Sequence, residues 1–74
     1  MPKLYSAKKT VSAFRRAGFK IVSQRGSHLK MRGIRDKKIQ TVIIPNFKEI
    51  PRGTFSSILN QANMTKLEFE SYYR

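Results

Sequence analysis

The sequence predicts an α+β fold, α-β-β-β-α, in which two helices cover one face of a three-stranded antiparallel sheet and a short C-terminal helix follows. Three observations lead to this prediction. Two segments of helical apolar spacing flank three short segments of strand character. The connections between the strand segments are short, which favours an antiparallel meander. Each main helical segment carries one apolar stripe, so both helices can cover the same face and leave the other face open.

Residues 6–18 are expected to form the first helix. Ser6 is a suitable N-cap, because its hydroxyl can accept a hydrogen bond from a free N–H of the first turn. Gly18 is the expected left-handed residue after the helix, and it would bring Phe19 against Phe14. The apolar stripe consists of Ala7, Val11 and Phe14.

Three segments are expected to be strands, namely residues 19–25, 28–32 and 39–44. In the second strand, alternation directs Leu29 and Met31 toward the core. The open face of the sheet then carries His28, Lys30 and Arg32. A shift of one residue in register would reverse this assignment.

The connections between the strands follow from their turn residues. Gly26 and Ser27 are expected to form a tight turn, and residues 33–38 a charged loop. Pro45 is expected to end the third strand because it has no N–H to donate. In the first strand, alternation places Lys20, Val22 and Gln24 on one side and Phe19, Ile21 and Ser23 on the other.

The second main helix is expected over residues 53–62, where apolar residues recur at helical spacing. Asn63 can adopt the left-handed conformation that closes it. Thr65 and Glu68 have the spacing of a capping box, which predicts a short last helix ending at Tyr73. A helix of this length is stable only when it packs against the rest of the protein.

The composition favours a polyanionic partner. The 74 residues include 16 Lys and Arg against 4 Asp and Glu, a net charge of +12, whereas solubility needs only about 2–8 charges. Nucleic acid is the first candidate, an acidic protein the second and an anionic membrane the third. No apolar run approaches the roughly 20 residues of a membrane span, and no signal peptide is evident. Without cysteine, the chain is compatible with a reducing compartment, and we expect it to be cytoplasmic.

His28 is the single histidine, and its position alone is typical of a surface residue at the start of a strand. It nevertheless follows Gly26 and Ser27, whose backbone and hydroxyl can approach a phosphate closely. Neighbouring cations favour a neutral imidazole that can act as a base near pH 7. The residues expected to contact RNA phosphates are Arg25, Gly26, Ser27, Lys30, Arg32, Lys48 and Arg52.

Metal-free RNA cleavage suits such a group of residues. The ribose 2′-OH attacks its own phosphodiester, so the protein needs only to move protons and to stabilise charge. The carboxylates Asp36, Glu49, Glu68 and Glu70 are scattered, and no cluster has metal-ligand spacing, so we expect no metal and no cofactor. Serine chemistry lacks an acidic group to orient His28 beside Ser27.

Two motifs resemble those of the HicA toxins of bacterial toxin–antitoxin pairs. The first is FRRAGFKIVSQRGSH (residues 14–28), and the second is RGTFSSILNQANMT (residues 52–65), which follows a strand ending Val-x-x-Pro. The resemblance covers about residues 4–65. The positions that match are Gly18, Phe19, Gly26, Ser27 and His28 in the first motif, and Gly53, Thr54, Ile58, Leu59, Gln61 and Ala62 in the second. The second motif departs from the usual pattern at Phe55, Asn60 and Asn63.

The resemblance implies that residues 1–74 are one HicA-like domain with the fold of a double-stranded-RNA-binding domain. It further implies a metal-independent endoribonuclease, an mRNA interferase, that cleaves messenger RNA with His28 as its catalytic residue. A HicB-type antitoxin would bind the toxin and block its active site. Many HicA toxins have a second histidine soon after the third-strand proline, where this chain has Asn46, so cleavage here would either be weaker or depend on His28 alone.

Two other functions fit the same residues. A non-catalytic module of the same fold would bind RNA by shape, through 2′-OH and phosphate contacts, without depending on His28. A basic protein-interaction domain would instead bind an acidic protein. For the antitoxin, the open face carrying His28, Lys30 and Arg32 is the expected contact surface, with Arg the expected centre of binding energy, and charge reversal at Arg32 should weaken binding of both RNA and antitoxin.

Overall fold

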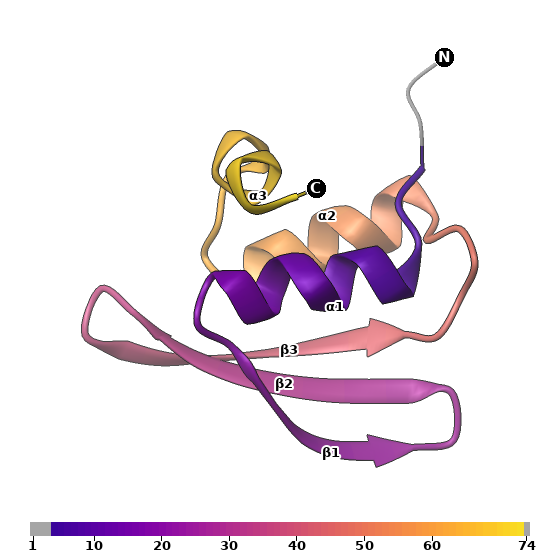
Figure 1. Cartoon of the computed structure of the whole chain (residues 1–74), viewed down its shortest axis with the longest axis horizontal. Helices are drawn as coiled ribbons and strands as arrows, with labels where there is room; N and C mark the ends of the chain where they lie inside the picture. The colour runs from indigo at the N-terminus through magenta and orange to yellow at the C-terminus, as the bar shows by residue number, and fades with distance from the viewer. Residues whose placement is uncertain (1–3, 74) are drawn as a thin grey trace.

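The computed structural model describes residues 4–73. The elements in chain order are α1 (Ala7–Arg16), β1 (Lys20–Arg25), β2 (His28–Arg35), β3 (Lys38–Pro45), α2 (Arg52–Gln61) and α3 (Lys66–Tyr72). The strands form one antiparallel sheet in the order β1-β2-β3. Helices α1 and α2 lie side by side over one face, and α3 lies on their far side from the sheet (Figure 1). The predicted fold class is confirmed.

Both main helices end in the same way. After α1, Gly18 has φ 100°, and the N–H of Phe19 donates to the carbonyl of Phe14 at 2.9 Å. The rings of Phe14 and Phe19 meet edge to face, with centroids 5.0 Å apart. After α2, Asn63 has φ 54° and the N–H of Met64 donates to the carbonyl of Leu59 at 2.9 Å. These are Schellman ends, in which the left-handed residue lets the last helical carbonyls find donors.

The hairpin between β2 and β3 corrects one prediction. Residues 33–38 are not a charged loop, because β2 continues to Arg35 and β3 begins at Lys38. Only Asp36 and Lys37 form the turn, with φ 52° and 65°. Two successive positive φ values define a type I′ turn, which usually contains Gly. This turn contains none, so the usual sequence signal of a hairpin is missing.

A bulge in β1 corrects a second prediction. The pairing register shifts between Ile21 and Ser23, so Ser23 pairs with Lys30 and Gln24 pairs with Leu29. Directly paired residues of an antiparallel sheet point to the same face. Ser23 therefore lies on the open face and Gln24 on the helix-covered face, the reverse of what strict alternation predicted. A bulge inserts one extra residue and inverts the side-chain pattern that follows it.

The core lies between the helices and the two strands β2 and β3. Its side chains that are at most 2% exposed are Ala13, Phe14, Phe19, Met31, Val42, Ile44, Ile50, Ile58, Ala62 and Phe69. The strand β1 is less covered, and Ile21 and Val22 on it are exposed. At the other edge of the sheet, the N–H of Ile43 donates to Oε1 of Gln61 at 2.9 Å. This bond satisfies one free donor of an edge strand.

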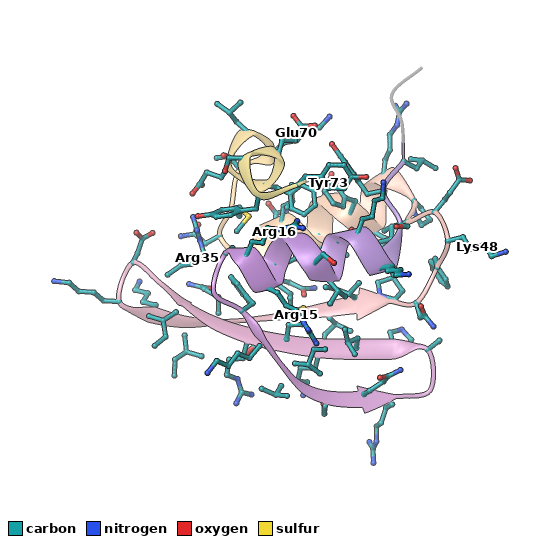
Figure 2. The ribbon with its side chains drawn as sticks, viewed as in Figure 1. Arg15, Arg16, Arg35, Lys48, Glu70 and Tyr73 are labelled. Atoms are coloured by element: carbon teal, nitrogen blue, oxygen red, sulfur yellow. The ribbon has the colours of Figure 1, made fainter. Side chains whose placement is uncertain are left out.

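Helix α3 is short, and it packs against the rest of the protein, as a helix of this length must in order to be stable. Thr65 and Glu68 form the predicted capping box. The guanidinium of Arg35, at the end of β2, lies 2.5 Å from a carboxylate oxygen of Glu68. In Figure 2, Arg16, Glu70 and Tyr73 mark the junction of α1 and α3. The ring of Phe69 fills the space between that junction and the rest of the core.

Among residues 4–73, no helix is both long and apolar enough to cross a membrane.

Candidate nucleic-acid interface and active site

The sheet's open face carries a cluster of basic side chains. The register places His28 opposite Arg25, Ser23 opposite Lys30 and Lys20 opposite Arg32, all on the face away from the helices. Of these residues only Lys30 is partly buried. We refer to Lys20, Arg25, His28, Lys30 and Arg32 as the basic face.

His28 lies at one corner of this face, directly after the turn that joins β1 to β2. Gly26, the first turn residue, has φ 54°, as the first central position of a type II′ turn requires. The N–H of Asn46 donates to the carbonyl of Ser27 at 2.6 Å, so the turn is tied to the segment that leaves β3. Since His28 also pairs with Pro45, its backbone is held on both sides while its side chain is exposed.

One charge pair on this face works against folding. Lys20 and Arg32 are direct cross-strand neighbours, and like charges in that position destabilise a sheet. The Nε of Arg32 donates to Oγ1 of Thr41 at 3.3 Å, which holds the guanidinium over the sheet. A bound polyanion would reduce the repulsion between these two cations.

The remaining predicted RNA contacts are not on the basic face. Lys48 lies between β3 and α2, and Figure 2 shows its side chain extending away from the protein. Arg52 is the first residue of α2 and, together with Tyr5 and Lys66, lines a separate hollow on the helical side. The structure thus brings Arg25, Lys30 and Arg32 together with His28, and it separates Lys48 and Arg52 from them.

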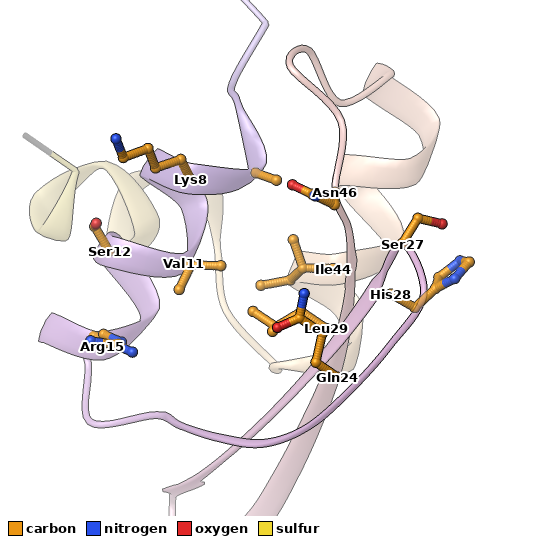
Figure 3. A pocket seen from close by; sticks show the side chains of 11 residues that line it. Lys8, Val11, Ser12, Arg15, Gln24, Ser27, His28, Leu29, Ile44 and Asn46 are labelled. Carbon is orange, nitrogen blue, oxygen red and sulfur yellow. The ribbon is translucent and has the colours of Figure 1, made fainter.

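A cleft between α1 and the β1–β2 hairpin was not predicted. Its volume is about 380 Å³, and it opens beside the turn that precedes His28 (Figure 3). In this view the side chains of Ser27 and His28 point away from α1, while those of Gln24 and Asn46 point into the cleft. The lining residues are Ala7, Lys8, Val11, Ser12, Arg15, Gln24, Ser27, His28, Leu29, Ile44 and Asn46. Sequence patterns do not indicate this cleft, because the bulge in β1 determines where the side chain of Gln24 points.

The acidic side chains do not gather near His28. Within the described part of the chain, no three side chains of Asp, Glu or His come together as metal ligands would. The charged residue directly paired with His28 is Arg25, and Lys30 and Arg32 follow on the same face, so charge stabilisation on this face would come from Arg and Lys.

Comparison of the chain with known protein families identifies the family to which it belongs. The family described as HicA toxin of bacterial toxin-antitoxin matches residues 7–64. The chain belongs to the HicA toxin family. Within this HicA toxin the matched region runs from the start of α1 to Met64, three residues beyond the end of α2, and it includes His28 and the cleft. No curated protein matches the chain significantly.

Membership of this family makes the protein the toxin member of a toxin–antitoxin pair, and an antitoxin is its partner. The match ends before α3, although α3 contributes Phe69 to the core. The hydrophobic core of this HicA toxin therefore includes a side chain from outside the matched region.

Proposed function

We propose that this HicA toxin is a metal-independent endoribonuclease that cleaves messenger RNA in the cytoplasm, with His28 as general acid and base. The observation that supports this most is the place of His28, exposed beside a glycine turn on the basic face. A single imidazole among cations is sufficient for a reaction whose nucleophile belongs to the substrate.

The reaction needs two proton transfers and charge stabilisation. The imidazole of His28 takes the proton of the ribose 2′-OH as that oxygen attacks the adjacent phosphorus. The bond from phosphorus to the 5′ oxygen of the next nucleotide breaks, and that oxygen receives a proton. The products are a 2′,3′-cyclic phosphate and a free 5′ hydroxyl. Arg25, Lys30 and Arg32 stabilise the extra negative charge of the phosphorane.

The binding step depends on charge. The basic face attracts the RNA backbone, and the turn at Gly26 and Ser27 lets a phosphate come close to the backbone N–H groups. Lys48, between β3 and α2, and Arg52, at the start of α2, would contact more distant phosphates of the same RNA strand. Binding of this kind weakens as salt is raised, because it releases counterions.

The partner that restrains this activity is, in our proposal, a HicB-type antitoxin that covers the basic face. An acidic surface on the antitoxin would pair with Arg32 and Lys30 and exclude RNA from His28. Buried pairs between Arg and a carboxylate are frequent centres of binding energy in such interfaces.

The test uses purified wild type and His28→Ala with single-stranded RNA in EDTA. We expect wild type to cleave and the variant to be slower by about 10²–10⁴-fold, the usual contribution of general acid–base catalysis. Circular dichroism checks that the variant is folded. Equal cleavage by both proteins would contradict the role of His28. Intact RNA after long exposure to wild type, with salt-sensitive binding, would favour the non-catalytic RNA-binding module.

A further inference from the structure

The cleft beside His28 has the lining of a small-molecule site. Its volume of about 380 Å³ lies at the lower end of the range for ligand pockets, roughly 300–1,000 Å³. Val11 on α1 faces Leu29 and Ile44 on the sheet, and these three side chains form an apolar floor (Figure 3). A site of this kind binds a flat or compact group that is mostly apolar and has a few polar atoms at its edge.

Two carboxamides stand at the rim of this floor. Gln24 lies on the β1 side and Asn46 follows β3. The side chain of Gln24 faces the cleft only because of the bulge between Ile21 and Ser23. A carboxamide presents a donor beside an acceptor, which is the complement of a base edge, and adenine is its most frequent partner.

The charge at the rim favours a ligand with phosphate. Lys8 and Arg15 stand on the same side of α1, about two helical turns apart, and both border the cleft. No Asp or Glu is among the lining residues of this cleft in the described part of the chain. An apolar floor, amide edges and a cationic rim together match a nucleotide better than they match an apolar peptide or a lipid.

We propose that this cleft binds one unstacked base of the RNA, an adenine, close to the scissile phosphate. The inference rests on the proposed ribonuclease function for the place of that phosphate. The turn at Gly26 and Ser27 separates the cleft from the basic face, so a strand that passes over the turn has a phosphate at His28 and a neighbouring base in the cleft. Proteins that read single-stranded RNA commonly splay a base out of the strand and form hydrogen bonds with its edges.

The experiment measures binding without cleavage. The probe is a short single-stranded RNA with a 2′-deoxy nucleotide at the scissile position, read by fluorescence anisotropy. An abasic site is moved along this RNA one position at a time. We expect one position near the scissile bond at which the missing base weakens binding by roughly ten-fold, because the base loses its apolar contact with the floor and its hydrogen bonds to the carboxamides. Uniform small effects at all positions would contradict the proposal.

Variants of two cleft residues then test whether the base at that RNA position lies in the cleft. Gln24→Leu and Val11→Phe are expected to weaken binding of the intact RNA and to abolish the effect of the abasic site. Val11→Phe fills the cleft from the α1 side, and Gln24→Leu keeps the fold because Gln24 is exposed. If both folded variants still lost as much affinity at the abasic position as wild type does, the base would bind outside the cleft.

The chain offers matched controls for charge. Lys8 borders the cleft, whereas the ammonium of its neighbour Lys9 lies 5.8 Å from the centre of the Tyr73 ring, toward α3. Arg15 borders the cleft, whereas Arg16 donates to the carbonyl of Tyr72 at 3.0 Å. We expect Lys8→Ala and Arg15→Ala to weaken RNA binding several-fold more than Lys9→Ala and Arg16→Ala. Equal effects within each pair would show general attraction only and would contradict the cleft.

Base identity gives the last comparison. RNAs that carry each of the four bases at the sensitive position should bind most tightly with adenine, and Gln24→Leu should remove that preference. A preference for another base would overturn the adenine assignment. If wild type shows the position-dependent binding but leaves cleavable RNA intact, the base site stands and the ribonuclease proposal fails. If wild type cleaves RNA but no abasic position weakens binding more than the others, the proposed base site is wrong and the ribonuclease proposal stands.

Discussion

The ring of Phe19 lies directly on the backbone of Gly33, where a β-carbon would stand 2.7 Å from Cγ of that ring. Real side chains do not approach so closely, so Gly33 is the residue that lets Phe19 reach β2. The ring is buried and also touches Phe14. Through Phe19, the end of α1 is held against the sheet. Since α1 forms one wall of the cleft, the same contact helps to position that wall.

Gly33→Ala should therefore destabilise the protein. Overpacking of this kind costs about 1–3 kcal/mol, and each 1 kcal/mol lowers the Tm of a domain this small by roughly 4–8 °C. Thermal unfolding followed by circular dichroism measures the change. Gly53→Ala is the matched control, because nothing lies within 4 Å of a β-carbon there and alanine favours the helix. An unchanged Tm in Gly33→Ala would show that Phe19 moves aside freely.

The same contact explains one failure of the sequence analysis. Glycine, aspartate and lysines between two apolar segments are typical of a loop, so residues 33–38 were expected to be one. Here Gly33 serves a close approach within a strand, and the turn at Asp36 and Lys37 takes left-handed conformations without glycine. The role of Gly33 is visible only from the position of Phe19, and a turn without glycine lacks the usual sequence signal.

The helices and the faces of β2 were predictable for a different reason. Their signals are local, since the Schellman ends at Gly18 and Asn63 and the alternation of Leu29 and Met31 depend only on neighbours in sequence. The cleft depends on a bulge in β1 and on the distance between α1 and an uncovered strand. Those are tertiary features, and a bulge has no reliable sequence pattern, so Gln24 and Asn46 were not recognised as lining residues.

Acid should weaken the attachment of α3. The hydrogen bond from Arg35, followed by the backbone bond at Thr65, holds the pKa of Glu68 below its ordinary value of 4.5. A carboxylate with a lowered pKa stabilises the folded state above its unfolded pKa. That stabilisation is lost as the pH falls from about 4.5 through the lowered value.

Urea unfolding at a series of pH values between 7 and 2.5 measures this effect. We expect Glu68→Gln to be less stable than wild type at neutral pH, and the difference to shrink as the pH falls below about 4.5. A difference that stays constant across the series would mean that the Glu68 carboxylate contributes nothing through its charge.

Charge reversal at Arg32 should separate binding from stability. Arg32→Glu removes a cation from the basic face and turns the repulsive pair with Lys20 into an attractive one. We expect weaker binding to RNA and to an acidic antitoxin, with a Tm equal to or above that of wild type. The slope of log K against log salt should fall by about 0.7 for single-stranded RNA. Unchanged affinity for both partners would refute the basic face as the contact surface.

The last prediction concerns α3, which the family match does not include. Phe69 is 1% exposed and its ring lies against those of Tyr5 and Phe55, with centroids 5.2 and 4.9 Å apart. Phe69→Ala should cost about 3–5 kcal/mol, enough to unfold a marginally stable domain of this size.

Leu67 on the same helix is the matched control, since its side chain is 82% exposed. Leu67→Ala should leave the Tm within about 2–4 °C of wild type, because surface substitutions change stability by no more than about 0.5 kcal/mol. Thermal unfolding of both variants decides the question. A folded Phe69→Ala protein with a Tm near that of Leu67→Ala would mean that α1, α2 and the sheet form a complete core by themselves. Loss of the folded state in Phe69→Ala alone would show that the toxin needs its last helix in order to fold.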